Sequence, residues 1–370
     1  MTDRATTRAE AEALFAAFQA AGARPFEADI LLPAEILLDL YGEDIRARAY
    51  VTTDPLRGEM MLRPDFTVPV VQAHMADGAD PARYCYMGEV FRKQDDLGAR
   101  ACEYLQVGYE VFAREAPEAA DAEVFALFYQ LLAPLGLQAV TGDIGILMAA
   151  VQGLNTTGHR KSALLRHIWR PKRFRALLDR FAGRTATPPA RVQLLERLAG
   201  GAHTALMAQA GTYIGLRAPE DIAARVESLL DDAATPPIAA PEAALLYDLL
   251  GLQAPAEAAL AHLQGITPLL PAIAPAVSRF EARLAALAAR GIDTATQPFE
   301  ASHGRTSLEY YDGFVFSFHA AGLPAGSPPV ASGGRYDALT AVLGQGRSIP
   351  AVGGVIRPAL VAAYRGASRC

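Results

Sequence analysis

The stretch RYCYMGEVFRKQDDLGARACEYLQVGYEVF, residues 83–112, predicts a two-stranded hairpin. Its first half ends in Arg92, and its second half carries Gln106, Gly108 and Glu110 at every second position. Alternate residues of a strand point to the same face, so these three positions face one way and span about 13 Å. A glycine inside a strand is typical of a place where a ligand approaches the backbone. We therefore expect a clamp for a molecule the size of an amino acid.

The composition of the chain excludes several broad classes of protein. With 370 residues and a formal net charge of −6, the chain is long enough for about two domains and lacks the basic character of a nucleic-acid binder. Cys85, Cys102 and Cys370 have neither disulfide-framework nor zinc-site spacing, so we expect a reducing compartment and no metal. The charged N-terminal segment is unlike a signal peptide, and no apolar run is long enough to span a membrane. We expect a cytoplasmic protein.

The predicted elements divide the chain into three parts. Residues 1–155 mix helices with extended stretches, residues 156–255 read as helical throughout, and residues 256–370 return to strands. Hairpins separated by helices indicate an α+β fold, an antiparallel sheet flanked by helices. We predict one core made of residues 1–155 and 256–370, with residues 156–255 as a helical insertion.

The segment LRPDFTVPV, residues 62–70, is the first candidate addition to the clamp. If it is extended, Asp65 and Thr67 face the same way. A carboxylate beside a hydroxyl suits an ammonium group, which offers only hydrogen-bond donors. The alternative is that Asp65 caps a helix that starts near Val68.

Two later segments carry candidate aromatic contacts. SLEYYDGFVFSF, residues 307–318, reads as a strand, in which Tyr310 and Tyr311 face opposite ways, so only one of them can face a ligand. Both tyrosines could instead pack at a strand end. In SGGRYDAL, residues 332–339, the glycine pair lets the backbone approach a ligand beside Tyr336. A plain Gly–Gly turn before a helix fits this segment equally well.

The order of these segments, LRPD–x–T, the hairpin with Q–x–G–x–E, then LEYY, GGRYD and AVGG, closely resembles the histidyl-tRNA synthetase family. The resemblance covers most of residues 25–155 and 300–355, and it implies a class II synthetase fold with a histidine pocket. It places the ammonium group at Asp65, Thr67 and Gln106, although the family usually has glutamate at the first of these, and the imidazole at Glu110 and Tyr311. Together with the hairpin arginine and the GGRYD tyrosine, the predicted histidine-binding residues are Asp65, Thr67, Arg92, Gln106, Glu110, Tyr311 and Tyr336.

The chain departs from the synthetase pattern where ATP would bind. The hairpin loop carries Asp95 and Asp96, where the family typically has a glutamate and then an arginine and a proline. Adenylation needs several cations around the polyphosphate, so lost arginines disfavour it. The resemblance with these departures predicts no catalytic residues and no cofactor. The other departing positions are Cys102 in place of an arginine, Thr306 at the catalytic arginine with Arg305 just before it, and Ala359 with Leu360 in place of a Glu–Arg pair.

The chain also continues only sixteen residues beyond Gly354, where a synthetase continues into an anticodon-binding domain. We therefore expect no such domain and no tRNA partner. LRPD followed by T–x–P resembles more closely a paralogous family, the regulatory subunits of ATP phosphoribosyltransferase. That resemblance implies a non-catalytic subunit of histidine biosynthesis, partnered by the short-form catalytic subunit, with histidine as its feedback effector. It also implies a self-dimer within a hetero-oligomer.

Two alternatives stay open. A divergent enzyme could still form histidyl-adenylate, with Arg92 as its phosphate contact. A pure assembly scaffold could retain the pocket as a relic.

The role of one basic segment is also open. Residues 159–184 carry nine Lys or Arg and one Asp, together with Trp169. They could form a solvated helical face, contact nucleic acid, or dock an acidic partner through Arg166 and Arg170. By analogy with class II synthetases, residues 36–50 are a candidate dimer contact.

Overall fold

The predicted hairpin forms and lies near one edge of the main sheet. The structure is a computed structural model that describes residues 3–35, 49–94, 101–201, 203–209, 218–305, 310–320 and 327–367. Strands β5 (Ala82–Phe91) and β6 (Glu103–Phe112) pair antiparallel over their whole length. Tyr86 lies opposite Gly108, and Gly88 lies opposite Gln106. This register places Gln106, Gly108 and Glu110 on one face of the sheet, as the sequence predicts.

The hairpin belongs to a large sheet that is mixed, not purely antiparallel as predicted. In the described residues this sheet has nine strands in the order β1-β5-β6-β12-β11-β10-β7-β9-β8. The pairs β1–β5 and β7–β9 are parallel, and the other pairs are antiparallel. The remaining strand bounds are β1 Arg24–Pro25, β7 Gln138–Asp143, β8 Gln253–Pro255, β9 Pro298–Glu300, β10 Phe314–His319, β11 Ala331–Arg335 and β12 Ala351–Ile356.

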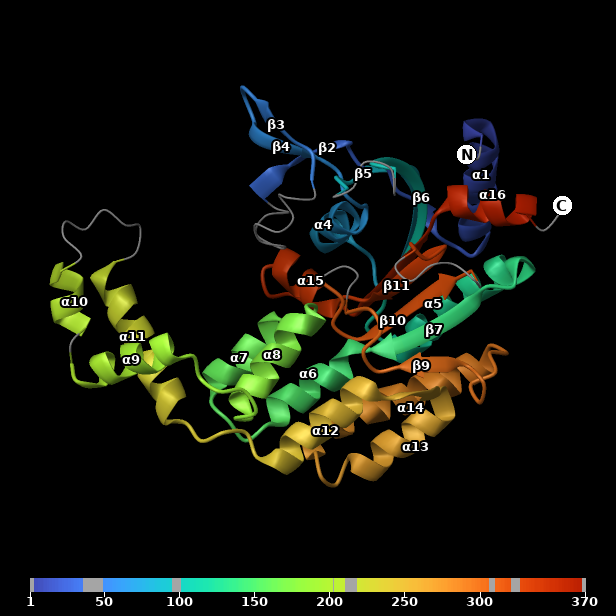
Figure 1. The fold of residues 1–370 in the computed structure, drawn as a ribbon. Helices are drawn as coiled ribbons and strands as arrows, with labels where there is room; N and C mark the ends of the chain where they lie inside the picture. The colour runs from blue at the N-terminus through green and yellow to red at the C-terminus, as the bar shows by residue number, and fades with distance from the viewer. Residues whose placement is uncertain are drawn as a thin grey trace.

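Helices α1 (Arg4–Ala20), α5 (Pro117–Leu132) and α16 (Pro358–Ala367) pack on one face of this sheet (Figure 1). Apolar residues of α1 recur at helical spacing, and the Phe18 ring stacks on Phe128 and packs at a tilt against Tyr109, at centroid distances of 5.4 and 5.3 Å. Helix α5 packs in turn against α14 (Ala274–Ala289). Because Tyr109 faces this helical layer, its neighbour Glu110 faces the other side of the sheet.

The opposite side carries α4 (Thr67–Asp77) and α15 (Asp337–Leu343), which contact each other (Figure 1). A second, three-stranded sheet stands beside them in the order β2-β4-β3. Its strands are β2 Leu31–Pro33, β3 Val51–Asp54 and β4 Gly58–Leu62. These elements frame the face on which Gln106 and Glu110 lie.

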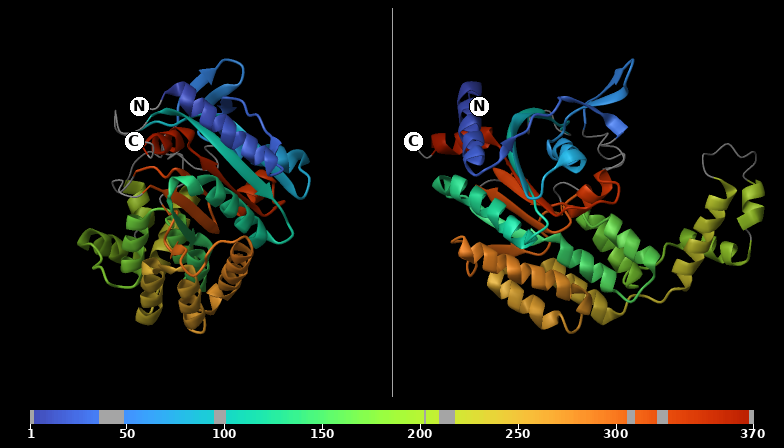
Figure 2. Two further views of the ribbon diagram at one scale, coloured as in Figure 1. Left: turned by 90° about the vertical axis from the view of Figure 1, so that its right-hand side faces the viewer. Right: turned by 180° about the vertical axis from the view of Figure 1, so that it is seen from behind.

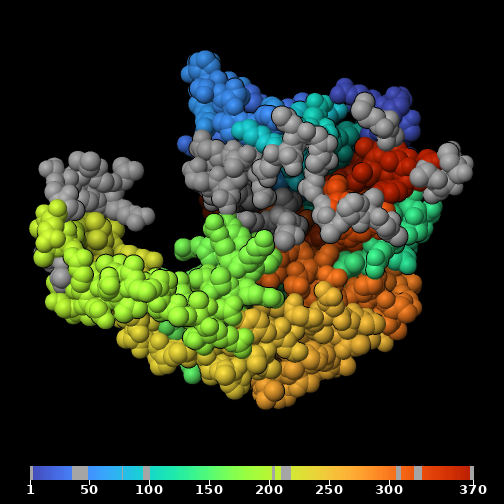
Figure 3. Space-filling model, in the orientation of Figure 1, coloured from blue at the N-terminus to red at the C-terminus, as the bar shows by residue number. Residues whose placement is uncertain are grey.

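The middle of the chain is helical, and α9 to α11 extend away from the sheet as an arm (Figure 2). Figure 3 shows open space between this arm and the β3–β4 hairpin. The predicted domain boundaries at 155 and 255 stay a prediction. The helices not yet given are α6 Ile144–Gly153, α7 Gly158–Arg166, α8 Pro171–Phe181, α9 Pro189–Ala199, α10 His203–Gln209, α11 Pro219–Ala234, α12 Ala240–Gly251 and α13 Ala256–Ile266, with 3₁₀ turns η1 Ala133–Leu135 and η2 Pro271–Ile273.

Several sequence expectations fall outside the described residues: Asp95 and Asp96 in the hairpin loop, Thr306, and most of the candidate dimer segment 36–50. In the part of the chain that the structure describes, no helix combines the length and apolarity that a membrane crossing requires. Among the same residues, no group of three or more His, Cys, Asp or Glu side chains is placed to hold a metal ion.

Candidate functional site

Glu110 lies at the centre of a buried cluster of hydroxyl groups. Its side chain is 1 % exposed, and Oε1 accepts hydrogen bonds from Tyr86 at 2.9 Å and Thr67 at 3.2 Å. Oε2 accepts one from Tyr336 at 2.6 Å. Burial raises the pKa of Glu110 to about 7, although the three hydroxyl donors favour its charged form. The carboxyl group can therefore change its charge near neutral pH.

Tyr86 is a member of the cluster that the sequence analysis did not identify. It pairs with Gly108 across the hairpin, and a Cβ at Gly108 would overlap the Tyr86 ring. Phe66 stacks on the other side of this ring at a centroid distance of 4.4 Å. The space above Gly108 thus holds a tyrosine ring, where the sequence predicted room for a ligand. A large aromatic residue opposite a glycine in the hairpin register was the available signal.

Thr67 reaches Glu110 from the first turn of a helix, so the prediction of an extended segment at 65–67 is wrong. Helix α4 begins at Thr67, close to the alternative start near Val68, and its N-cap residue, Phe66, makes no side-chain capping bond. Asp65 and Thr67 are each 4 % exposed. Asp65 is close enough to Glu110 for its charge to raise the pKa of Glu110 further. Asp65 and Thr67 therefore both lie at the cluster, but the start of a helix brings them there and not an extended segment.

Tyr310 and Tyr311 both lie at the site, which corrects the prediction that only one of them could face it. Strand β10 begins at Phe314, so the two tyrosines precede the strand and do not alternate between its faces. The Tyr310 hydroxyl is 3.3 Å from Thr67 Oγ1, and the two phenol rings meet edge to face at 4.8 Å. Burial, and after it the Glu110 charge, raise the pKa of Tyr311 above its ordinary value.

Tyr336 meets Glu110 beside glycine residues of the neighbouring strands. The alternative of a plain Gly–Gly turn is wrong: Gly333 and Gly334 lie within β11, and Tyr336 immediately precedes α15. Gly353, on the neighbouring strand, lies opposite Glu110, and a Cβ there would overlap Glu110 Oε2. Because residue 353 is a glycine, the Glu110 carboxylate can occupy this space.

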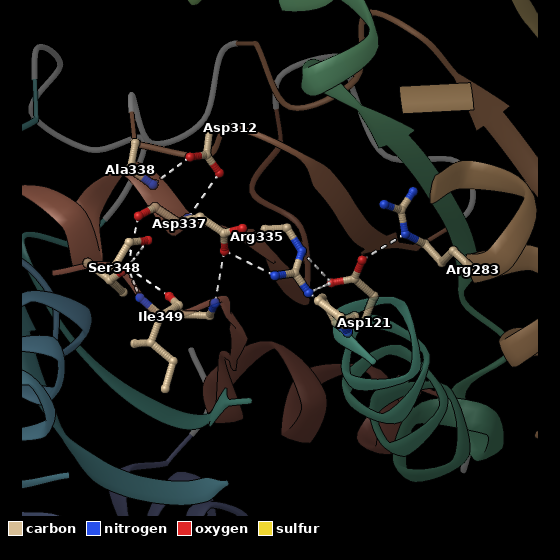
Figure 4. A network of polar contacts seen from close by, with 11 residues as sticks. Asp121, Arg283, Asp312, Arg335, Asp337, Ala338, Ser348 and Ile349 are labelled. Carbon is tan, nitrogen blue, oxygen red and sulfur yellow. Dashed lines mark hydrogen bonds and ion pairs between the residues drawn. The ribbon is translucent and has the colours of Figure 1, made fainter. Parts of the chain in front are cut away.

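A buried ion network fixes the residues on both sides of Tyr336 (Figure 4). Arg335 donates to Asp121 on α5 at 2.7 Å and to Asp337 at 3.0 Å. Asp121, which is fully buried, also accepts from Arg283 at 2.8 Å. Asp312 accepts hydrogen bonds from the main-chain N–H groups that open α15. Because these charged groups are hydrogen-bonded to one another, they hold the backbone around Tyr336 in place.

Gln106 is the one predicted residue whose polar atoms have no hydrogen-bond partner in the described part of the chain. Its side chain is 1 % exposed, and both Nε2 and Oε1 are buried. A buried amide left unbonded costs about 1–3 kcal/mol. Two donors and an acceptor therefore remain available for a ligand on the Glu110 face of the hairpin.

Arg92 lies just beyond the end of β5, where Nε donates to the main-chain carbonyl of Pro64 at 2.8 Å. This bond joins the hairpin to the segment that carries Asp65. Arg305, the neighbour of the departing position Thr306, lies in a turn and not in a strand. It is 4 % exposed, and its Nε donates to Ile168 O at 2.6 Å.

The turn between α7 and α8 contacts the site on both sides of the segment 306–309. Arg305 bonds Ile168 before this segment, and after it the indole N–H of Trp169 donates to Tyr311 O at 3.2 Å. The Arg305 guanidinium also lies over the Phe174 ring, 4.7 Å from its centroid. The basic helices of residues 159–184 are thus attached to the Tyr311 backbone.

The arrangement suits recognition of a ligand that carries an N–H donor. A carboxylate has about four acceptor positions, and the hydroxyl groups occupy three of those on Glu110. One position on Oε2 remains, and Gln106, whose amide is unbonded, lies about 13 Å from Glu110 along the backbone of the same strand. A separate cavity of about 590 Å³ opens on the opposite face of the sheet, where Arg83, Tyr109 and Glu123 line it.

Comparison with known proteins gives a consistent result. The sequence profile described as histidyl-tRNA synthetase matches residues 3–251 and 221–359. An ATP phosphoribosyltransferase regulatory subunit from Sinorhizobium medicae is 34% identical over 364 residues, 92% of this chain and 93% of that protein. The protein of the same description from Allorhizobium ampelinum is 32% identical over 364 residues, 93% of this chain and 94% of that protein.

A solved structure shares the fold. It is an ATP phosphoribosyltransferase regulatory subunit/histidyl-tRNA synthetase from Bacillus halodurans, and it matches with a TM-score of 0.67 at 19% identity. The match covers 98% of this chain and 81% of that one. The class II synthetase-like fold predicted from the sequence is confirmed, with a mixed sheet.

Proposed function

The chain belongs to the family of ATP phosphoribosyltransferase regulatory subunits, which shares the histidyl-tRNA synthetase profile, and from this membership we propose that it binds histidine at Glu110 and conveys feedback inhibition. The predicted regulatory role in histidine biosynthesis agrees with the descriptions of these relatives. The histidine pocket and the inhibition are the parts that we propose here.

The observation that carries the proposal is the hydrogen-bonding capacity left unused at Glu110 and at Gln106. Glu110 keeps one acceptor position on a carboxylate whose pKa is about 7, and Gln106 keeps a complete amide without a partner. Histidine brings an imidazole N–H to the first and a charged α-amino-acid group to the second. Asp65 and Thr67 lie beside Glu110, so small rotations at the pocket would bring them to the ligand as well.

Discrimination for histidine follows from the same groups. A side chain without an N–H would leave the Glu110 position unbonded in a dry site, which strongly disfavours the wrong ligand. Tyr86, Tyr310 and Tyr336 are buried around the carboxylate and exclude water from it.

The partner in this proposal is the short-form catalytic subunit of ATP phosphoribosyltransferase, and this chain performs no catalysis of its own. Two features of the described residues support the absence of catalysis. Arg305 points its Nε to the α7–α8 turn, and Ala359 and Leu360 stand at the start of α16 where a synthetase has a Glu–Arg pair. Feedback then requires that histidine bind two states of the assembly unequally, and a coupling of about 1–3 kcal/mol gives roughly 5- to 150-fold modulation.

Calorimetric titration of the purified chain with histidine and with phenylalanine tests the pocket. We expect saturable histidine binding, at least about 100-fold weaker binding of phenylalanine, and a loss of about 10- to 150-fold in Glu110→Gln. Glu115→Gln, a change of an exposed carboxylate three residues beyond the same strand, is the control and should bind as the parent does.

Absence of histidine binding to the parent chain would overturn the pocket. Histidine-dependent exchange of pyrophosphate into ATP by the purified chain would instead overturn the non-catalytic part of the proposal.

A further inference from the structure

Arg180, at the base of the arm, lies within electrostatic range of three other arginines and one aspartate, and the four arginines come from four helices. They are Arg160 on α7, Arg180 on α8, Arg191 on α9 and Arg225 on α11, and the acid is Asp232 on α11. We call the four arginines the arginine cluster. Figure 1 shows α7 and α8 where the arm that carries α9 and α11 joins the body. The group has a formal charge of +3, because one carboxylate faces four guanidinium groups.

Asp232 is already engaged by Arg160. The Nε of Arg160 donates to Asp232 Oδ1 at 2.7 Å, and its two other nitrogens donate to main-chain carbonyls, including that of Pro236 at 2.8 Å. Arg160 is 6 % exposed and has its donors occupied. Arg191 reaches the second carboxylate oxygen at 3.4 Å, a long contact. The carboxylate thus leaves the remaining cations largely unneutralised.

The side chain of Arg180 has one buried nitrogen without an acceptor. Within the described residues, its Nε is buried and has no hydrogen-bond partner. Its guanidinium lies over the Phe181 ring at 4.6 Å, and Arg160 faces the same ring at 5.1 Å. Burial lowers the pKa of Arg180, and the neighbouring arginines lower it further, with Asp232 opposing them. A partly desolvated cation surrounded by cations is unfavourable unless an anion joins it.

We propose that the arginine cluster binds a compact, multiply charged anion that carries phosphate groups, at Arg180, Arg191 and Arg225. The planar guanidinium fork matches phosphate oxygens in pairs, and several converging forks select for more than one negative charge. Phosphate groups could come from a free pyrophosphate or nucleotide or from an RNA backbone. The observations favour the free anion, because the cluster is local and the chain as a whole carries a net charge of −6. This site is separate from the Glu110 pocket and does not depend on the proposed histidine binding.

Titration of the full chain with pyrophosphate, at constant ionic strength set with chloride, tests the site. We expect saturable binding that weakens about 10-fold or more in Arg180→Gln and in Arg225→Gln. Arg225 is exposed, so Arg225→Gln should fold normally even if Arg180→Gln disturbs folding. Arg173→Gln, at an exposed position on α8, is the control and should leave the affinity unchanged.

Pyrophosphate binding that is no stronger than that of chloride, or that is the same in all three variants, would overturn the proposal. A parallel titration with a single-stranded RNA oligonucleotide separates the two sources of phosphate. Tight RNA binding that Arg180→Gln abolishes, without pyrophosphate binding, would overturn the free-anion assignment. Histidine affinity in Arg180→Gln should equal that of the parent, which distinguishes failure at this site from failure at the pocket.

Discussion

The indole N–H of Trp169 donates a hydrogen bond to the main-chain carbonyl of Tyr311 across 3.2 Å, although 142 positions separate the two residues in the sequence. This bond joins the turn between α7 and α8 to the segment that carries two tyrosines of the Glu110 cluster. It is the most direct contact between the basic helices and the proposed histidine pocket. Displacement of those helices by a partner would therefore act on the Tyr311 backbone.

Replacing Trp169 by phenylalanine keeps an aromatic ring and removes the N–H donor. One neutral hydrogen bond is worth about 0.5–1.5 kcal/mol, so histidine affinity should fall about 2- to 10-fold. Calorimetry measures this, with Arg173→Gln on α8 as the control. An unchanged histidine affinity in Trp169→Phe would show that the turn does not position the pocket.

Replacing Gln106 by leucine should separate stability from binding. The amide has no partner in the described residues, so its removal should stabilise the free protein by about 1–3 kcal/mol. The same change removes a ligand contact, so histidine affinity should fall. Urea unfolding and calorimetry on one preparation measure both effects. A destabilised variant that binds histidine normally would contradict both the unpaired state and the role of Gln106.

Replacing Gly353 by alanine should disrupt the Glu110 cluster. The added Cβ would overlap Glu110 Oε2, so the carboxylate or the strand must move. We expect a loss of about 1–3 kcal/mol in unfolding free energy, as for overpacking, and a marked loss of histidine affinity. Gly251→Ala, where a Cβ meets no atom within 4 Å, is the matched control. Equal behaviour of the two variants would refute the packing at Gly353.

Glu110 should give stability a pH dependence of definite sign. Burial raises its pKa from 4.5 to about 7, so the folded protein holds this proton more tightly than the unfolded chain does. The resulting stabilisation is fully present below about pH 4.5 and is lost as pH rises through about 7. Relative to Glu110→Gln, the parent should lose roughly 3 kcal/mol over this range.

Urea unfolding of both proteins at about pH 5 and about pH 8 checks the difference. Asp312, whose pKa burial and Asp337 also raise to about 7, is present in both proteins, so its contribution cancels. A parent that gains stability relative to the variant as pH rises would contradict the raised pKa of Glu110.

The period of two in β6 was sufficient to place Gln106, Gly108 and Glu110 on one face, because strand geometry alone decides it. The same rule failed at Tyr310 and Tyr311, because the chain there precedes β10 and does not alternate. It failed at Thr67 too, because a helix starts at that residue. Local pattern therefore predicted the site only where regular strand pairing continues.

Other members of the site depend on contacts between distant segments. Tyr86 could have been found, since its position opposite Gly108 follows from the hairpin register. The bond from Trp169 to Tyr311 could not, because no local pattern relates a helix turn to a loop so far along the chain. The ion network of Asp121, Arg283 and Arg335 likewise requires the assembled layers.

The central claim is that histidine acts on the catalytic partner through Glu110. The most direct measurement is the activity of the complex of this chain with the short-form ATP phosphoribosyltransferase subunit, titrated with histidine, for the parent and for Glu110→Gln. We expect equal activity without histidine, inhibition of the parent complex, and a shift of the Glu110→Gln curve to about 10- to 150-fold higher histidine. Inhibition of both complexes at the same histidine concentration would contradict the claim.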